Sequence, residues 1–293
     1  MFTVFKRITK YLQGRNLGKI PGVRRLYQFL FGIFKPQGLV VIMTKSGNKM
    51  LVDTKDKGCA PYLMINGVHE EFETELVEKH IKKGMRVVDI GAHIGYFTII
   101  FSKLVGGGGK VYAFEPEPYN YKLLVKNIEL NNLSNSNIVL ECCALSDKKG
   151  VVKLFLDKSN LGNVSMAKGN IPTVDLGKEV EVETVTLDDY LQDQKVDFIK
   201  MDIQGAEGLV IDGAKEVFTK NKLKLLIEFC PYNLRNLGTD PLGLLKQLES
   251  WGFKLRVIDG QRKMLKLSHP EAIVGISKNR PEGKGWTNLF CEN

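Results

Sequence analysis

The sequence predicts an α/β protein built on one mostly parallel sheet with helices on both of its faces. Short apolar segments alternate with segments of helical spacing along most of the chain, and this alternation is typical of βα units. Seven apolar segments are predicted as strands of the core sheet, at residues 87–90, 110–114, 138–142, 198–201, 223–229, 253–258 and 286–291. With 293 residues, 43% of them hydrophobic, the chain can bury one large core of this kind.

Helices are predicted between these strands. The first covers residues 70–82, where Phe72, Leu76 and Ile81 recur at helical spacing. Acidic residues precede basic ones along it, as the helix dipole favours. Further helices are predicted at residues 119–131, 187–192, 206–211, 214–221 and 240–251.

Three other segments lie outside this alternation. Residues 38–43 and 49–53 flank the turn sequence Lys-Ser-Gly-Asn and are predicted to form a hairpin. A second hairpin-like pair is predicted near residues 151–156 and 179–186. Between these two strands, residues 157–178 are predicted as the longest loop and as a candidate lid over a substrate.

The positive charge is concentrated in an N-terminal arm. The chain carries a net charge of +9, and residues 1–49 contain ten Lys or Arg and no Asp or Glu. In residues 1–12 the apolar side chains share one helical face and the basic ones take much of the other. This pattern is typical of an amphipathic helix at an anionic membrane surface, and packing on the rest of the chain explains it equally well. Nucleic acid is disfavoured, because the arm lacks a stacking platform.

Compartment and redox state are predicted from features that the sequence lacks. Lys35 and Pro36 interrupt the apolar run at residues 26–43, so no stretch of about 20 apolar residues is available to span a membrane. Residues 1–12 lack the continuous apolar core of a signal peptide. We therefore expect a cytoplasmic protein, with contact to an anionic membrane through residues 1–35 as an open alternative. The five cysteines have neither metal-ligand nor disulfide spacing and are expected to be reduced core thiols.

A nucleoside pocket is predicted where the first core strand ends. Residues 87–97 (VVDIGAHIGYF) combine a buried strand, a glycine turn and a helix start, and the next strand ends in Glu115. Gly91 and Gly95 allow backbone to lie close to a ligand, and the helix start offers N–H groups. Glu115 can accept hydrogen bonds from both hydroxyls of a ribose. NAD enzymes and S-adenosylmethionine enzymes share this arrangement.

The glycine spacing and Asp89 favour S-adenosylmethionine over NAD. A pyrophosphate site needs the spacing G-x-G-x-x-G, whereas this turn has only Gly91-x-x-x-Gly95. The carboxylate of Asp89 would repel a pyrophosphate, but it suits the cationic methionine end of S-adenosylmethionine. A similar turn in an unrelated α/β protein remains the alternative.

Four sequence blocks together resemble one enzyme family. Residues 89–98 (DIGAHIGYFT), 114–116 (FEP), 144–147 (ALSD) and 200–207 (KMDIQGAE) are similar to the FkbM family of S-adenosylmethionine-dependent methyltransferases. The resemblance covers about residues 70–260. It implies a Rossmann-like class I methyltransferase fold and O-methylation of a sugar, polyketide or similar metabolite. His93 and Gln204 depart from the family pattern, which has Asn and Glu at these positions.

Together, these observations predict a domain organisation and a cofactor site. Residues 1–69 are expected to form the basic arm and hairpin, and residues 70–293 the methyltransferase domain. Ligands of open parallel sheets bind at the carboxyl ends of the strands. Cofactor contacts are therefore expected from Asp89, Gly91, Ala92, Gly95, Glu115, Ala144, Leu145 and Asp202, with Ala144 and Leu145 against the adenine.

A catalytic base is expected beside the acceptor, because a hydroxyl that attacks the sulfonium methyl group must lose its proton. Asp202 is the first candidate and Glu228 the second, with Glu207 and His69 as further candidates. Lys200 is expected to point to the opposite face of its strand and to be structural. The acceptor is expected to be a hydroxyl of a small molecule or glycan: a sugar, a glycan or lipid-linked molecule, or a secondary metabolite.

Alternatives remain open for these residues and for the function. Asp202 and Glu228 could hold Mg²⁺ between them, or Asp202 could cap the helix that begins near residue 206. A non-catalytic S-adenosylmethionine-binding module would keep Asp89 and Glu115 but lack a base. An NAD-binding oxidoreductase is the third functional alternative. A nucleobase nitrogen is disfavoured as acceptor, because the sequence after the fourth core strand is Asp-Ile-Gln-Gly and lacks the Pro-Pro-Tyr/Phe of amino methyltransferases.

Overall fold

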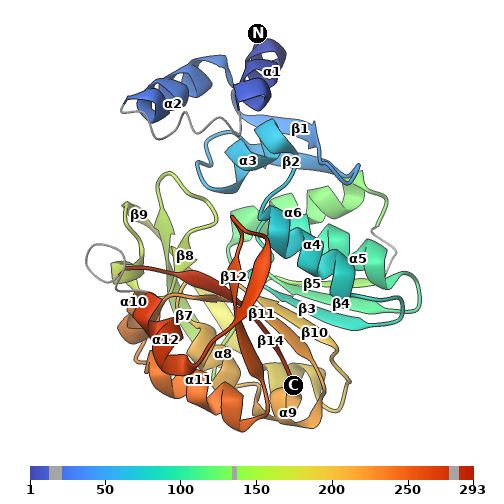
Figure 1. Cartoon of the computed structure of the whole chain (residues 1–293). Helices are drawn as coiled ribbons and strands as arrows, with labels where there is room; N and C mark the ends of the chain where they lie inside the picture. The colour runs from blue at the N-terminus through green and yellow to red at the C-terminus, as the bar shows by residue number, and fades with distance from the viewer. Residues whose placement is uncertain (13–21, 134–136, 277–283) are drawn as a thin grey trace.

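The core of the protein is one mixed sheet between two layers of helices (Figure 1). The computed structural model describes residues 1–12, 22–133, 137–276 and 284–293. Eight strands pair in the order β13-β12-β14-β11-β10-β3-β4-β5. They are β3 (Arg86–Ile90), β4 (Lys110–Phe114), β5 (Ile138–Glu141), β10 (Phe198–Met201), β11 (Lys224–Phe229), β12 (Lys254–Asp259), β13 (Met264–Leu267) and β14 (Thr287–Glu292). The strands from β5 to β11 are parallel, and β14 runs antiparallel between β11 and β12.

The predicted fold class and all seven predicted core strands are confirmed. The eighth strand, β13, was not predicted. It lies at the edge of the sheet beside β12, and three of its four residues are exposed. A short exposed edge strand needs no alternation of apolar and polar residues, so its sequence carries little strand signal.

Helices cover both faces of the sheet (Figure 1). One layer contains α4 (Glu71–His80), α5 (Tyr96–Val105) and α6 (Pro118–Leu130). The other contains α7 (Leu187–Leu191), α8 (Glu207–Asp212), α9 (Lys215–Lys220), α10 (Pro231–Asn236), α11 (Pro241–Ser250) and α12 (Pro270–Ile276). Each layer buries an apolar core against the sheet, and α10 and α12 are additions to the predicted helices.

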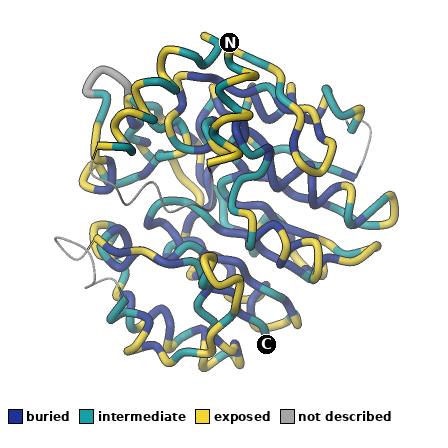
Figure 2. The backbone as a smooth tube through the Cα atoms, turned by 45° about the horizontal axis from the view of Figure 1, so that its top comes forward, coloured by how far each residue is buried: buried dark blue, intermediate teal, exposed yellow. Residues whose placement is uncertain are grey.

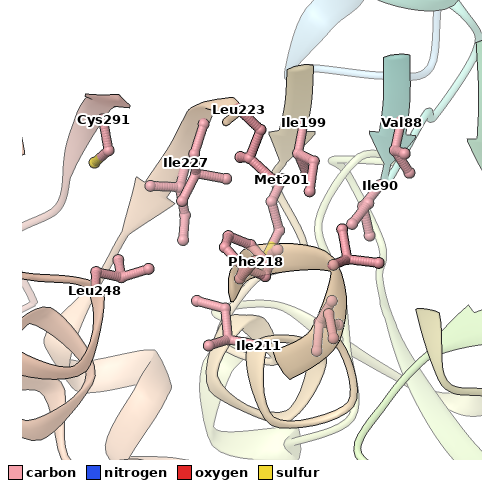
Figure 3. Packing of buried hydrophobic residues seen from close by; sticks show 14 of the residues in the cluster. Val88, Ile90, Ile199, Met201, Ile211, Phe218, Leu223, Ile227, Leu248 and Cys291 are labelled. Atoms are coloured by element: carbon pink, nitrogen blue, oxygen red, sulfur yellow. The ribbon is translucent and has the colours of Figure 1, made fainter. Parts of the chain in front are cut away.

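Side-chain alternation along the strands determines which residues reach each face. In β3, Val88 and Ile90 face one apolar core, which Figure 3 shows together with Phe218 of α9. Asp89, between them, lies on the second face. In the paired strands it is the register partner of Lys200 in β10. The register of β3 and β10 therefore places a buried acid beside a buried base.

A smaller sheet of four strands lies beside the core, in the order β6-β9-β7-β8. Its strands are β6 (Ala144–Leu145), β7 (Gly150–Asp157), β8 (Val164–Ser165) and β9 (Val174–Val185). The prediction of a continuous loop at residues 157–178 is therefore wrong in part. β8 is held by pairing with β7 rather than by an apolar pattern of its own, and a two-residue strand is too short to give a sequence signal.

The N-terminal segment has two helices, a hairpin and a third helix. They are α1 (Phe2–Leu12), α2 (Val23–Phe34), β1 (Leu39–Met43), β2 (Lys49–Asp53) and α3 (Cys59–Asn66). The predicted hairpin is confirmed. Met50 of β2 and Leu63 of α3 belong to the same apolar core as Phe101 of α5, and Leu51 of β2 bonds Asn127 of α6, so the hairpin packs on the helix layer of this face of the sheet. The predicted domain boundary after residue 69 stays a prediction.

The structure also bears on the expected state of the cysteines and on the expectation about membrane-spanning segments. All five cysteines are free. Cys142 is exposed, so the expectation of a core thiol is wrong for it, because it follows edge strand β5. Cys143 is half-buried and packs against the apolar core. None of the helices in the described residues is long and apolar enough to cross a membrane.

Phe218 is expected to carry much of the packing between α9 and the sheet. It is fully buried, and truncation of a buried Phe leaves a cavity that costs about 3–5 kcal/mol. We expect Phe218→Ala to lower the free energy of unfolding by that amount in urea titrations. Val151→Ala, at a position that is 64% exposed, is the control and should change it by less than about 0.5 kcal/mol. Equal effects of the two substitutions would contradict the assigned core.

Candidate active site

A cavity of about 1210 Å³ opens at the carboxyl ends of the parallel strands. Eight of the nine residues predicted for the site line it: Asp89, Gly91, Ala92, Glu115, Ala144, Leu145, Asp202 and Glu228. Gly95 does not line it and packs instead against Leu124 of α6, whose methyl group would lie 2.5 Å from a Cβ at this position. The structure thus brings together strand ends that are far apart in the sequence.

Asp89 lines this cavity and has one buried, unpartnered carboxylate oxygen. Its Oδ2 accepts a hydrogen bond of 2.6 Å from Thr98 Oγ1. Its Oδ1 is buried and has no hydrogen-bond partner in the described part of the chain. Burial raises the pKa of Asp89, and the nearby Lys200 and the Thr98 hydroxyl oppose that rise. A buried acceptor of this kind is costly unless a ligand satisfies it.

The glycine turn after β3 lies against the backbone at the ends of its two neighbouring strands, β4 and β10. Gly91 has φ of 79°, and a Cβ there would lie 2.1 Å from the carbonyl oxygen of Asp202. The N–H groups of Gly91 and Ala92 both donate to the carbonyl of Phe114 at 3.0 Å. These two amides are therefore used within the protein, whereas the helix whose N–H groups were expected to serve a ligand begins later, at Tyr96.

Glu115 is oriented by the backbone on both sides of it. One carboxylate oxygen accepts from the N–H of His93 at 2.7 Å, and the other accepts from the N–H of Glu117 at 2.9 Å. Burial raises the pKa of Glu115 to about 8, and these two N–H donors oppose the rise. Each oxygen keeps a second lone pair that can accept from a ligand hydroxyl.

Lys200 lies on the cavity side of β10, so its predicted orientation is wrong. Lys200 and Asp202 are two residues apart, and residues two apart on a strand share a face. Lys200 Nζ lies 3.7 Å from Asp202 Oδ2 and 4.8 Å from the centroid of the Phe97 ring. Burial lowers the pKa of Lys200, but the carboxylates around it, with Asp202 first, outweigh burial and raise the pKa to about 12.

Gln204 joins the two predicted catalytic carboxylates. Its Nε2 donates to Asp202 Oδ1 at 3.2 Å and to Glu228 Oε2 at 2.9 Å. Its backbone has φ of 53°, and its carbonyl accepts from Ser165 and Asn170. Burial and the neighbouring Asp202 raise the pKa of Glu228 well above its usual range.

The structure excludes two roles that the sequence allowed, Asp202 as a helix cap and Glu207 as the catalytic base. Helix α8 has Ala206 at its N-cap without a side-chain cap, so Asp202 does not cap it. Glu207 instead accepts from the N–H groups of Ile203 and Gly205 within this turn. Glu207 is buried and does not line the cavity, so it is excluded as a base.

The cavity wall also contains residues that sequence reasoning ranked low or missed. His69 lines the cavity, and burial and Lys200 lower its pKa to about 4. Glu70 has φ of 49°, and burial raises its pKa to about 7. It was missed because it was predicted as the first residue of a helix, whereas it is the left-handed N-cap of α4. His93 has a buried Nε2 with no hydrogen-bond partner among the described residues.

The segment between β7 and β8 forms part of the cavity wall. The N–H of Lys57 donates to the Ser159 carbonyl at 2.7 Å, and Asn120 Nδ2 donates to the Leu161 carbonyl at 2.8 Å. Asn160 and Gly162 from this segment line the cavity. This part of the predicted loop thus borders the cavity, and its role as a lid stays a prediction.

In the chain as described, no three His, Cys, Asp or Glu side chains are grouped in a way that could hold a metal ion. Asp202 and Glu228 share the amide of Gln204 instead.

Comparison with known proteins agrees with this geometry. Residues 89–255, more than half of the chain, match the model of the Methyltransferase FkbM domain. The chain belongs to the FkbM methyltransferase family. Methyltransferase sdnD of Sordaria araneosa is 28% identical over 192 residues, which cover 56% of this chain and 70% of that protein. Methyltransferase 1 of Beauveria bassiana is 26% identical over 162 residues, 49% of this chain and 64% of that protein.

A solved structure of the same family is also similar. The FkbM methyltransferase from Methylobacillus flagellatus KT gives a TM-score of 0.44 at 20% identity, covering 71% of this chain and 43% of that one. This FkbM chain therefore spans less than half the length of the solved protein.

The protonation of Glu115 is expected to make the stability of the FkbM domain depend on pH. The folded-state pKa of about 8 lies above the ordinary value of 4.5, so folding favours the protonated form. The resulting stability is fully present below about pH 4.5 and is lost as the pH rises through about 8. We expect the free energy of unfolding of Glu115→Gln, measured in urea at pH 5, 7 and 9, to fall less with pH than that of the parent.

The exposed position Glu183 supplies the control for this experiment. Glu183→Gln should keep the parental pH dependence. A Glu115→Gln protein that loses stability between pH 5 and 9 as steeply as the parent would show that Glu115 does not titrate in this range.

Proposed function

We propose that this FkbM chain is an S-adenosylmethionine-dependent methyltransferase that acts on a hydroxyl group of a small molecule or glycan. The observation that carries the proposal is the buried, unpartnered oxygen Oδ1 of Asp89, a residue that lines the same cavity as the backbone-oriented Glu115. An acceptor for an amino group and an acceptor for ribose hydroxyls are the two groups that an aminoacyl nucleoside needs.

The charge of the cavity supports a cationic cofactor. The carboxylates of Asp202, Glu70, Asp89 and Glu228 all act on one buried cation, Lys200. The excess of carboxylates favours a ligand with ammonium and sulfonium groups and disfavours the pyrophosphate of NAD. In this proposal Asp89 receives the amino group, Glu115 the ribose, and the buried Ala144 and Leu145 of β6 the adenine.

The carboxylates of Asp202 and Glu228 suit removal of the proton from an acceptor hydroxyl. When bound, S-adenosylmethionine supplies a methyl group that its sulfonium activates toward attack. Glu228 is the base that we assign, because a carboxylate with a raised pKa is a stronger base than an ordinary one. Asp202 is already paired with Lys200, and the Gln204 amide holds both carboxylates in position.

The size of the cavity and the sequence after β10 support a hydroxyl acceptor. A volume of about 1210 Å³ exceeds the usual range of about 300–1000 Å³ for one ligand, which leaves room for an acceptor beside the cofactor. Residues 202–205 lack the Pro-Pro-Tyr/Phe sequence that accepts amine protons. A non-catalytic cofactor-binding module is the second candidate, and Gln204 in place of the family's Glu is the observation in its favour.

Cofactor binding is tested by thermal unfolding with S-adenosylmethionine, S-adenosylhomocysteine and NAD. A ligand at 100 times its dissociation constant should stabilise the protein by about 2.7 kcal/mol. We expect stabilisation by the two sulfur nucleosides and none by NAD. Glu115→Ala should lose most of this shift, and the exposed Glu183→Ala should keep it. No shift with folded, ligand-free protein would overturn the cofactor assignment, and a shift with NAD alone would establish an oxidoreductase.

The base is tested by transfer of a radiolabelled methyl group from S-adenosylmethionine to a panel of sugars and polyketide alcohols. We expect Glu228→Gln to lower kcat by about 10²–10⁴-fold, the usual contribution of a general base. The thermal shift with cofactor should remain. Activity of the parent should rise with pH, because the raised pKa of Glu228 delays its ionisation. A fully active Glu228→Gln would exclude this residue as base, and turnover by the parent would exclude the non-catalytic alternative.

A further inference from the structure

Helices α1 and α2 pack on each other through aromatic rings. The ring centroid of Phe5 lies 5.8 Å from that of Tyr27 and 5.6 Å from that of Phe34. Phe2 lies 6.2 Å from Phe31. These contacts use one face of each helix. α1 nevertheless contains no buried residue (Figure 2), so the pair forms a thin layer over the rest of the protein.

The faces of α1 and α2 that point away from their mutual contact carry exposed apolar side chains. Six large side chains recur at intervals of three or four residues and are each more than half exposed: Val4, Ile8 and Tyr11 on α1, and Leu26, Phe29 and Ile33 on α2. A surface helix of a globular protein normally places polar residues on its outer face. Exposed apolar stripes of this kind mark an interaction surface.

The charge of the layer identifies the kind of partner. Lys6, Arg7, Lys10 and Arg25 belong to these helices, and no Asp or Glu occurs anywhere in residues 1–49. A surface that combines apolar stripes with positive charge alone is complementary to an anionic bilayer, into which apolar side chains insert while basic ones meet the headgroups. Each basic residue near such a surface contributes about 1 kcal/mol.

The layer also forms part of the cavity wall. Lys6 and Lys10, one turn apart on α1, line the same cavity as Asp89 and Glu115. Burial and the neighbouring Lys10 lower the pKa of Lys6. The helix that carries the exposed apolar stripe is therefore the helix that borders the entrance to the candidate active site.

We propose that α1 and α2 form a peripheral membrane-binding surface for anionic bilayers, and that this surface holds the cavity entrance at the level of the lipid headgroups. An acceptor embedded in, or attached to, the bilayer then reaches the cavity past Lys6 and Lys10. The identity of the cavity as a methyl-transfer site rests on the proposed function, whereas binding of the bilayer by the two helices does not.

The proposal is tested with the full chain by co-sedimentation with vesicles of phosphatidylcholine, with and without phosphatidylglycerol. We expect binding only to the anionic vesicles, weakened by salt. Ile8→Asp/Phe29→Asp removes apolar insertion, and Arg7→Glu/Arg25→Glu reverses two exposed charges that flank the apolar stripes. Loss of two basic contacts at about 1 kcal/mol each corresponds to about 30-fold weaker binding, and reversal should exceed this.

Matched substitutions outside the layer serve as controls. Val151→Asp/Leu267→Asp changes two apolar residues that are both 64% exposed, and Lys148→Glu/Lys149→Glu reverses two exposed charges in the turn before β7. Both should bind vesicles as the parent does. Equal binding by all four variants, or no binding by the parent, would overturn the proposal. A solution dimer that Ile8→Asp/Phe29→Asp dissociates would assign the stripes to self-association instead.

Insertion of the helix is measured by tryptophan quenching. Ile8→Trp should gain fluorescence that brominated phosphatidylcholine in anionic vesicles quenches, and Val151→Trp should gain fluorescence that it does not. Equal quenching of both would contradict insertion through α1. The thermal shift with S-adenosylmethionine requires no vesicle, so failure of membrane binding and failure of the proposed function give separate results.

Discussion

The buried amine of Lys200 is the group on which the arrangement of the site depends. Four carboxylates act on it, those of Asp202, Glu70, Asp89 and Glu228. Buried carboxylates without a nearby cation are costly, and removal of one partner from such a group is far more damaging than the net value of the pair. Lys200 has its place because β10 pairs with β3 in the register that sets it beside Asp89. The register of two central strands thus determines the electrostatics of the cavity.

The sequence could predict the acids at the strand ends but not the hydrogen bonds that orient them. Parallel strands present their carboxyl ends at one edge, so Asp89, Glu115 and Asp202 could be collected from strand order alone. The conformation of the turn at Gly91 could not be predicted, because the N–H groups of Gly91 and Ala92 bond a carbonyl on β4. Glu70 was missed for a similar reason: its left-handed conformation depends on how α4 joins the hairpin segment rather than on its own residue type.

The orientation of Lys200 follows from the alternation of side chains along a strand. That rule gives the right face only when it is applied to the interval from Lys200 to Asp202, which is two residues. The strand Phe198–Met201 is buried on both faces, so its sequence has no alternation that separates inward from outward positions. The two-residue interval from Lys200 to Asp202 was the available signal, and it places both side chains on the cavity side. Once they are on one face, their opposite charges explain why a lysine is tolerated in an otherwise apolar strand.

Gln204 completes this balance of charge. The site already holds four carboxylates around one ammonium, and a Glu at position 204 would add another acid within hydrogen-bond distance of Asp202 and Glu228. An amide donates N–H to both of these carboxylates, so it lowers the repulsion between them and leaves no additional charge. Because the amide takes one oxygen of each acid, the second oxygen of Glu228 is the one that remains for an acceptor. The departure from the family pattern is therefore compatible with a working base, with the glutamine as a positioning residue.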